Sequence, residues 1–392
     1  MSDIFYGFEL LLFKRFLAHP EQWVEWRGNL AEKINDAGVI EIEDVGEIPQ
    51  SLWFLSVALH KRQRALIQLI KYDVKREQEG KFFRSSETLL SKYLHLNQFT
   101  EFQLDSIFKY GEDNRLPSEI FSCPNVRKLS LKYNGLDYLP ADIGRMSLLE
   151  SLALTNNKLQ VQSIPYSLSF CSKLNTLLLD NNLLDALPGF LLQMPSLKTV
   201  HRHGNHNYFK ATFMWYHTDV HYRIIPLTTN NDKSKDILQP ASLEFWAAKS
   251  VIGAKKDFFN DSVFANTLKD YISEIYSLFH ICHYCSRACL YNVPGFKVIT
   301  FKNPYLGNTC VPFQHWACSI DCARALEVPA RNEQIAAACE LDLKYEQYIH
   351  DCQEVYRGQR SSPLCVCSSD SSVVNLSRPK QPDTAKCTCV IS

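Results

Sequence analysis

The fold is decided by the stretch Leu129-Ser-Leu-Lys-Tyr-Asn134-Gly-Leu-Asp-Tyr-Leu139-Pro140, because its pattern of leucines around one asparagine returns along the chain. Later copies carry their asparagine at Asn157, Asn182 and Asn205, which gives a period of roughly 23 to 25 residues. A unit of this length is one short strand and a return segment, and it cannot bury its leucines alone. The repetition therefore predicts an array of stacked units.

This pattern is typical of the leucine-rich repeat. It predicts a short α/β leucine-rich-repeat solenoid of about four or five repeats, because such repeats need several stacked neighbours. Leu116-Pro117 marks the end of a degenerate first unit. We interpret the recurring asparagines as structural, since a buried amide can pair with backbone groups of the neighbouring coil.

Residues between the strand leucines must face the other side of the sheet, because side chains alternate along a strand. The alternation predicts that Lys132, Thr155, Asp180 and His203 lie on the concave face as partner-binding residues. Their mixed charges suit a protein segment better than a phosphate backbone. The alternative is a face that is merely solvated.

The stretches on either side of the repeats differ in composition and periodicity. Helical spacing in residues 5–17, 21–37 and 51–78 predicts a helical N-terminal domain that caps the repeats at that end. The complete organisation that we expect is a helical domain at 1–100, repeats and a second cap at 101–226, a linker at 227–239, a helix with a cysteine module at 240–327, a helix at 328–357 and a disordered, lipidated tail at 358–392.

The helix expected over 240–252 carries a narrow apolar stripe. At three- and four-residue spacing it brings together Leu243, Trp246, Ala247 and Val251. A large residue followed by small ones lets another protein approach closely, so these four are predicted to bind a partner. The alternative is an ordinary core helix, which produces the same spacing.

Two close pairs of cysteines follow this helix, Cys282-x2-Cys285 and Cys318-x3-Cys322. Four thiolates in two short pairs have the number and spacing of a structural zinc site, and four protein ligands leave no open position for catalysis. Cys289, Cys310 and His315 are alternative ligands nearby. Another reading is that the cysteines are small buried thiols.

The order of these elements is repeats, then the helix over 240–252, then the cysteine module. This order resembles the intracellular substrate receptors of cullin–RING ubiquitin ligases, in the group of leucine-rich repeat-containing protein 58 and its relatives. The resemblance rests on residues 129–188, 242–251 and the two cysteine pairs. It implies that Leu243 fills a pocket of elongin C, with Ala247 and Val251 beside it, and that elongin B and a cullin (cullin 2 or cullin 5) join the complex. Ala247 replaces the commoner cysteine of the elongin box.

One departure from that group lies at residues 253–292, which contain no proline. Receptors of this type carry a proline-containing box there that selects the cullin. The choice of cullin therefore stays open, and so does an alternative function as a leucine-rich-repeat scaffold in membrane-proximal signalling without a ligase role.

Composition limits the other classes of function. The 42 basic and 42 acidic residues cancel, so no net field draws the chain to nucleic acid. Phosphate-binding glycine loops and nucleophile motifs are not found in the sequence, which predicts a protein that is not an enzyme. The N-terminal stretch lacks the features of a secretory leader, which predicts a cytoplasmic protein with reduced cysteines.

The last four residues, Cys389-Val-Ile-Ser392, fit a prenylation motif, and a final serine indicates farnesyl. Cys387 is a candidate for a second lipid, which stable membrane attachment requires. The tail therefore predicts a lipid anchor at Cys389 and Cys387. With the resemblance, it predicts a membrane-tethered ubiquitin-ligase adaptor.

Overall fold

The structure is a computed structural model that describes residues 4–7, 9–10, 89–108, 116–205, 223–227, 242–302 and 311–360. The chain divides into two units, residues 1–335 and residues 336–392. Within the described residues, no helix has both the length and the apolar character that crossing a membrane requires.

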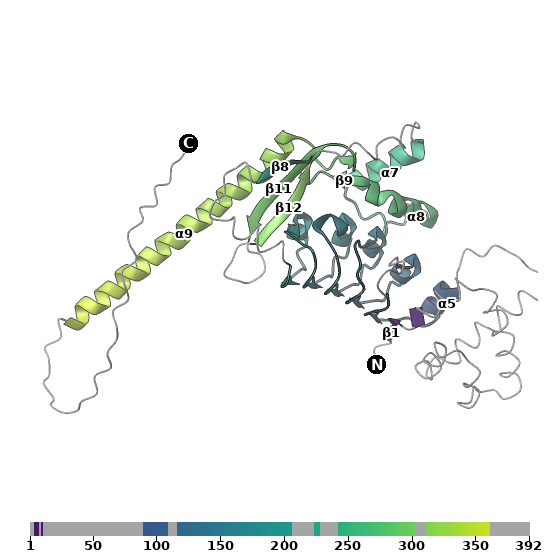
Figure 1. The fold of residues 1–392 in the computed structure, drawn as a ribbon, viewed down its shortest axis with the longest axis horizontal. Helices are drawn as coiled ribbons and strands as arrows, with labels where there is room; N and C mark the ends of the chain where they lie inside the picture. The colour runs from purple at the N-terminus through teal and green to yellow at the C-terminus, as the bar shows by residue number, and fades with distance from the viewer. Residues whose placement is uncertain are drawn as a thin grey trace, which may run out of the picture. The chain divides into compact units, whose positions relative to one another are not determined.

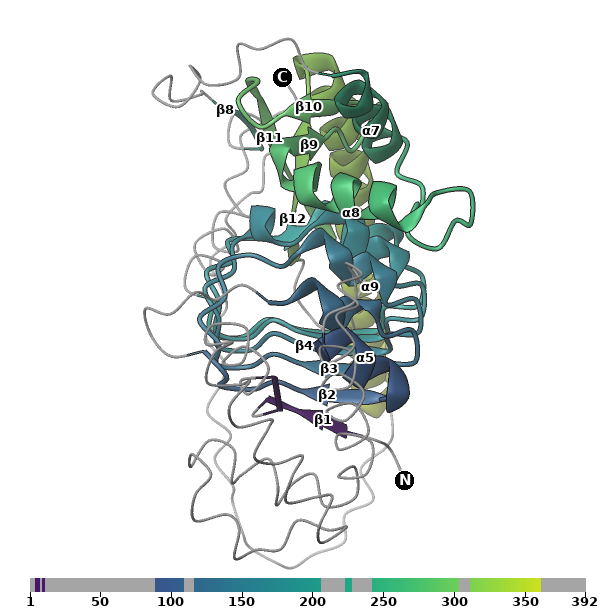
Figure 2. The same ribbon diagram turned by 90° about the vertical axis from the view of Figure 1, so that its right-hand side faces the viewer.

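A six-stranded parallel sheet runs through the first unit (Figure 1). Leu129, Leu152, Leu177 and Val200 occupy equivalent positions in four neighbouring strands, and all four are buried. Figure 2 shows the successive coils one above another. In sheet order, the strands are β1 (Ile4–Tyr6), β2 (Glu101–Gln103), β3 (Lys128–Ser130), β4 (Ser151–Ala153), β5 (Thr176–Leu178) and β7 (Thr199–His201).

The recurring asparagines form a ladder of hydrogen bonds between coils. Asn157 Oδ1 accepts from the backbone N–H of Asn134 at 3.1 Å and of Leu136 at 3.0 Å. Its Nδ2 donates to the carbonyl oxygens of Leu131 at 3.0 Å and Leu154 at 2.9 Å. The side chain is almost fully buried. The amide thus satisfies four backbone groups that would otherwise be unpaired inside the protein.

Each asparagine of the ladder follows a residue in the left-handed backbone region. The φ angles of Tyr133, Asn156, Asn181 and Gly204 are 58°, 58°, 53° and 71°. Asparagine and glycine tolerate this conformation at low cost, whereas tyrosine does not. The repeat fold therefore requires a left-handed residue after each strand. Tyr133 adopts this conformation although asparagine or glycine would be less strained.

Short 3-10 helices return the chain on the other side of each coil. Four of them follow a proline whose φ lies between −56° and −72°, a value that the pyrrolidine ring imposes. The 3-10 helices of the repeats are η2 (Ser118–Ser122), η3 (Ala141–Arg145), η4 (Val161–Ser163), η5 (Tyr166–Phe170) and η6 (Gly189–Gln193).

The helix expected over residues 5–17 is only partly described: residues 5 and 6 lie in a strand, residues 7, 9 and 10 are helical, and residues 11–17 lie outside the described residues. Phe5 lies in β1, which pairs with β2, and its ring centroid lies 5.1 Å from those of Phe99 and Phe102. Phe99 follows the helix α5 (Leu89–Leu96). The aromatic cluster and the open edge of β2 together favour a strand here, since an edge strand leaves backbone groups unpaired.

A second sheet joins distant parts of the first unit (Figure 1). Its strands, in order, are β6 (Leu187–Pro188), β12 (Val311–Ala317), β11 (Gly295–Lys302) and β8 (Ile224–Leu227). Because β6 belongs to the repeats, the cysteine module shares a sheet with them. Among the described residues, the repeats and the cysteine module thus belong to one unit, residues 1–335.

The helices after the repeats pack on the repeat coils. Arg145 Nη2 lies 2.6 Å from Asp270 Oδ1, and Ser273 Oγ donates to Asp142 Oδ2 at 2.7 Å. Ala141 and Phe170 of the repeats share one apolar core with this region. The remaining elements are α7 (Leu243–Gly253), α8 (Asn266–Ile275), η10 (Tyr276–Leu278), β9 (Phe279–Ile281), β10 (Ala288–Leu290) and α9 (Ile320–Arg360).

Several expected segments lie outside the described residues. They are the helices at 21–37 and 51–78, the cap after residue 207, the linker residues 228–239 and the tail with Cys387 and Cys389. Lipid attachment therefore stays a prediction from the sequence. The helix expected at 328–357 is part of α9, which begins earlier and contains Pro329.

Replacing Asn157 tests the ladder. We expect Asn157→Ala to lower the free energy of unfolding by roughly 3 to 5 kcal/mol, because four buried backbone groups lose their partner. Asn156→Gly is the matched control, since glycine accepts a φ of 58° and should change stability by less than about 0.5 kcal/mol. Both are measured by chemical denaturation, and equal effects of the two substitutions would contradict a special role for the amide.

Candidate metal centre

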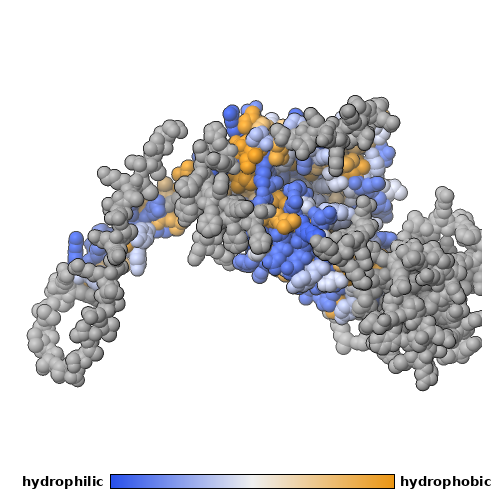
Figure 3. Space-filling model, viewed as in Figure 1, coloured by the Kyte–Doolittle hydropathy of each residue, from blue (hydrophilic) through white to orange (hydrophobic). Residues whose placement is uncertain are grey.

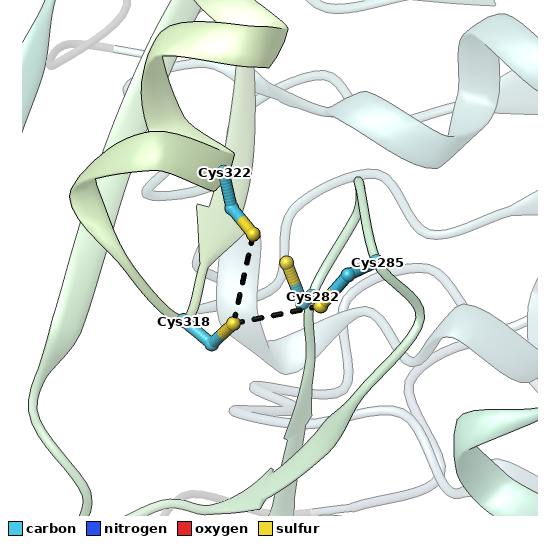
Figure 4. A group of neighbouring side chains, drawn as sticks. All are labelled: Cys282, Cys285, Cys318 and Cys322. Atoms are coloured by element: carbon cyan, nitrogen blue, oxygen red, sulfur yellow. Dashed lines mark hydrogen bonds between the residues drawn. The ribbon is translucent and has the colours of Figure 1, made fainter.

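Four cysteine thiols converge on one point in the first unit (Figure 4). Cys282 and Cys285 come from the turn between β9 and β10, Cys318 directly follows β12, and Cys322 lies in the first turn of α9. Their Sγ atoms all lie within 4.8 Å of one another. The structure therefore brings together the two pairs that sequence spacing singles out.

Local backbone geometry explains how Cys282 and Cys285 come close. The N–H of Cys282 donates to the Arg287 carbonyl at 2.9 Å, and the N–H of Ser286 donates to the Cys282 carbonyl at 3.0 Å. Ser286 has a φ of 60°, which closes the turn tightly. A turn of this kind points two side chains three residues apart toward the same point.

The second pair is fixed by the start of α9. The N–H of Cys322 donates to Ser319 Oγ at 3.2 Å, and the N–H of Ala323 donates to the Ser319 carbonyl at 3.0 Å. Ser319 thus caps the helix, with Cys318 just before the cap and Cys322 in the first turn. The positive end of the helix dipole favours thiolates at this position.

The sulfur separations fit a single tetrahedral ion. Cys285 Sγ lies 3.5 Å from Cys318 Sγ, which lies 3.8 Å from Cys322 Sγ. Thiolates about 2.3 Å from a central zinc would be separated by about 3.8 Å. A disulfide would require about 2.05 Å. The four side chains can therefore hold one metal ion without rearrangement of the backbone.

The thiols differ in how readily they lose a proton. Burial raises the pKa of Cys285, but hydrogen bonds from the Arg287 backbone and the neighbouring thiols outweigh it and bring the pKa to about 7. Burial raises the pKa of Cys318, and the hydrogen bond with Cys285 raises it further. The Cys285 thiolate is therefore favoured even without a metal, whereas Cys318 keeps its proton until a metal ion displaces it.

Lys255 provides a positive charge beside the cluster. Its Nζ donates to the His283 carbonyl at 3.2 Å and lies 5.5 Å from the ring centroid of Tyr166. Burial lowers the pKa of Lys255, while Cys282 and Cys285 act to raise it. Four thiolates around a divalent ion carry a net negative charge, which this ammonium group would partly neutralise.

The alternative ligands lie elsewhere. His315 Nδ1 is 3.0 Å from His283 Nδ1, and its Nε2 is 2.9 Å from Thr300 Oγ1. Burial lowers the pKa of His315 to about 4, so the ring is neutral and bonded on both sides. Cys289 lies on β10 outside the group of four thiols. Cys310 lies outside the described residues.

Next to the cluster, α7 presents two different faces. Phe245, Ala248 and Ile252 face the core of the module. The opposite face is open to solvent: the exposed fraction is 89% for Leu243 and 49% for Trp246. Ala247 is also exposed, whereas Val251 is half-buried and packs against the core of the module. Three residues of the predicted stripe therefore lie on the open face, and Val251 lies at its border with the core.

The four residues predicted on the concave face follow one another across neighbouring strands. Beyond the ends of the strands, neighbouring coils still form backbone hydrogen bonds. Their acceptors are the carbonyl oxygens of Lys132, Thr155, Asp180 and His203. Asp180 Oδ1 also accepts from the N–H of His203 at 2.7 Å, so it helps to hold the row in place. Lys132 and Thr155 keep their side chains partly exposed.

Sequence reasoning missed the contacts that connect the cluster to the repeats. Lys255 lies about 27 residues before Cys282 and has no spacing signal that links it to the cysteines. His315 was singled out by its spacing from Cys318, but as an alternative ligand and not as the hydrogen-bond partner of His283. Gly189 is a second example, because an added Cβ would lie 2.2 Å from His315 Nδ1. Its close approach to β12 depends on a tertiary contact that the local sequence does not encode.

No model of a protein family matches the chain, and no curated protein matches it. Among solved structures, a leucine-rich-repeat protein of Leptospira interrogans is similar at 27% sequence identity, with a TM-score of 0.25. The similarity covers 30% of this chain and 34% of that protein. The function is therefore inferred from the residues of this chain alone.

Replacing a clustered thiol tests the metal centre. We expect Cys318→Ser to lose the bound metal and to lower the melting temperature by several degrees, because three ligands no longer close a tetrahedral site. Cys289→Ser, in the same hairpin but outside the cluster, should keep both. Elemental analysis and a thermal melt measure the two effects. Equal metal content in both variants would contradict the assignment.

Proposed function

We propose that this chain is a leucine-rich-repeat adaptor that holds a protein target and presents it to a ubiquitin ligase through elongin C. In this proposal the concave face of the repeat solenoid binds the target, and the open face of α7 binds elongin C. A structural zinc ion in the four-cysteine cluster stiffens the module. The chain itself catalyses no reaction.

The observation that carries the proposal is the exposure of Leu243. Exposed apolar side chains are common singly, but Leu243, Trp246 and Ala247 form a continuous exposed stripe on a helix whose other face is in the core. Burying a leucine side chain stabilises a complex by about 1.5 to 3 kcal/mol. Helices of this kind bind by inserting their apolar face into a groove of the partner.

The metal cluster supports this role by fixing α7. Gly253, the last residue of α7, lies so close to the cysteine turn that an added Cβ would be 2.9 Å from the Ser286 carbonyl. The helix also contacts β9 and β10, which bracket Cys282 and Cys285. A helix whose position is fixed before binding loses less entropy when its partner arrives.

Zinc suits the cluster better than other ions. Four thiolates around a tetrahedral centre are typical of structural zinc, and among the residues that the structure describes the cluster consists of these four ligands. Such a closed set favours a structural role. The metal would therefore contribute to stability and leave chemistry to the partners.

The side chains on the concave face favour a peptide or protein as the target. Acidic, basic and hydroxyl side chains follow one another across neighbouring coils: Asp105, Lys132, Thr155, Asp180 and His203. Both signs of charge and a hydroxyl are present, which suits a polypeptide with its own mixed charges. A phosphate backbone would require a predominantly basic row.

A scaffold without a ligase role is the second candidate. It is favoured by the absence of proline from residues 253–292, where such receptors carry a cullin-selecting box. In that case α7 would bind a partner other than elongin C, or would bind elongin C without a cullin.

Substitution of Leu243 tests the adaptor function. We expect Leu243→Asp to abolish capture of purified elongin B/C while the melting temperature stays unchanged, because this side chain is 89% exposed. Val263→Asp is the matched control, since Val263 is 85% exposed and lies outside α7. It should retain full binding. If the wild-type chain fails to bind elongin B/C, the scaffold function replaces the adaptor function.

A further inference from the structure

The second half of α9 exposes a row of large apolar side chains. Hydrophobic residues reach the surface along this helix (Figure 3). Six of them are more than 60% exposed, and four of these six fall on one helix face: Leu341 (66%), Tyr345 (65%), Tyr348 (63%) and Val355 (61%).

The spacing of this row is that of a coiled coil. With the half-buried Cys352 included, successive members are separated alternately by four and three residues. An average of about 3.5 residues keeps one seam of a helix facing a neighbouring helix. We name residues Leu341, Tyr345, Tyr348, Cys352 and Val355 the α9 seam.

An isolated helix gains little from such a seam. Helical stability in proteins comes mostly from packing of an apolar face, and large exposed apolar patches mark interaction sites. Ion pairs along the helix, such as Lys344 Nζ to Glu340 Oε1 at 2.7 Å, contribute only about 0.3 to 0.5 kcal/mol each. The seam therefore requires a partner surface of matching shape.

We propose that the partner is the same seam of a second copy, packed antiparallel, so that the chain is a homodimer. Antiparallel alignment about the midpoint between residues 346 and 347 places Leu341 against Cys352 of the second copy. It also places Tyr345 against Tyr348 of the second copy. The arrangement is self-complementary, as a twofold interface must be.

The flanking charges favour this direction. Lys344 and Asp351 occupy equivalent positions beside the seam, one heptad apart, so an antiparallel pair brings Lys344 of one copy to Asp351 of the other. Each dimer contains this ion pair twice. In a parallel pair, Lys344 would face Ile349 and Asp351 would face Tyr356, so neither residue would meet an opposite charge on the second copy.

The size of the seam sets the expected affinity. In this alignment Leu341, Tyr345, Tyr348 and Cys352 pair within the seam, and Val355 lies beyond the paired layers. These four residues on each side, two of them tyrosines, would bury roughly 1,000 Å² in total, since one aromatic side chain buries about 150 to 250 Å². This area lies at the low end of specific interfaces, which bury about 1,200 to 2,000 Å². We therefore expect a dissociation constant in the micromolar range.

Sedimentation of the full chain tests self-association. We expect the wild type to shift from monomer to dimer as concentration rises through the micromolar range. Leu341→Asp should weaken the dimer about a hundredfold or more, because it places a carboxylate in each of two apolar layers. Leu343→Asp is the matched control: Leu343 is equally exposed (65%), but it lies about 200° further round the helix, so dimerisation should persist. A wild type that stays monomeric at high micromolar concentration, or equal loss in both variants, would overturn the proposal.

Charge reversal tests the antiparallel direction. Lys344→Glu and Asp351→Lys should each weaken the dimer roughly three- to tenfold, because both symmetric ion pairs become repulsive. The double variant restores opposite charges across the interface and should recover the wild-type constant. A dimer that is insensitive to the single reversals, or one that the double variant does not recover, would overturn the antiparallel arrangement.

Discussion

The convergence of four thiols on one point is the constraint on which the C-terminal part of the first unit depends. It joins the turn between β9 and β10 to the end of β12 and the start of α9. The close approach of Gly253 to Ser286 connects α7 to the same turn. Without a central ion, deprotonated thiols at this distance would repel one another. Protonated thiols would lack strong hydrogen-bond partners. With a central ion, the thiols fix the position of α7.

The repeats provide the rigid base for this arrangement. The asparagine ladder stacks each coil on the next, and β6, within the repeats, pairs with β12 of the module. An ion pair between Lys297 and Asp185 connects the same two regions. These contacts hold the cysteine module in a fixed position on the repeats. The open face of α7 and the row of Lys132, Thr155, Asp180 and His203 therefore belong to one unit.

The sequence predicts those features that repeat or cluster locally. The strands of the repeats follow from leucines and asparagines at a fixed period, and the thiol cluster follows from two short cysteine spacings. The exposed stripe of α7 also follows from local spacing, although exposure itself cannot be predicted from a period. Pairing of Leu187 with Phe313 and of Ile225 with Lys297 joins residues far apart in the chain, which leaves no local pattern. The strand at Phe5 was missed for the same reason, because its partners are β2 and an aromatic cluster about 90 residues later.

The most direct test of the central claim is the affinity of the intact chain for elongin B/C, measured by titration calorimetry with and without zinc. If the thiol cluster fixes α7 for its partner, the zinc-loaded protein binds one elongin B/C complex, and removal of zinc weakens binding at least about tenfold, or 1.4 kcal/mol. Restoring zinc should recover the affinity. Equal binding in both states, or no binding by the zinc-loaded protein, would contradict the account.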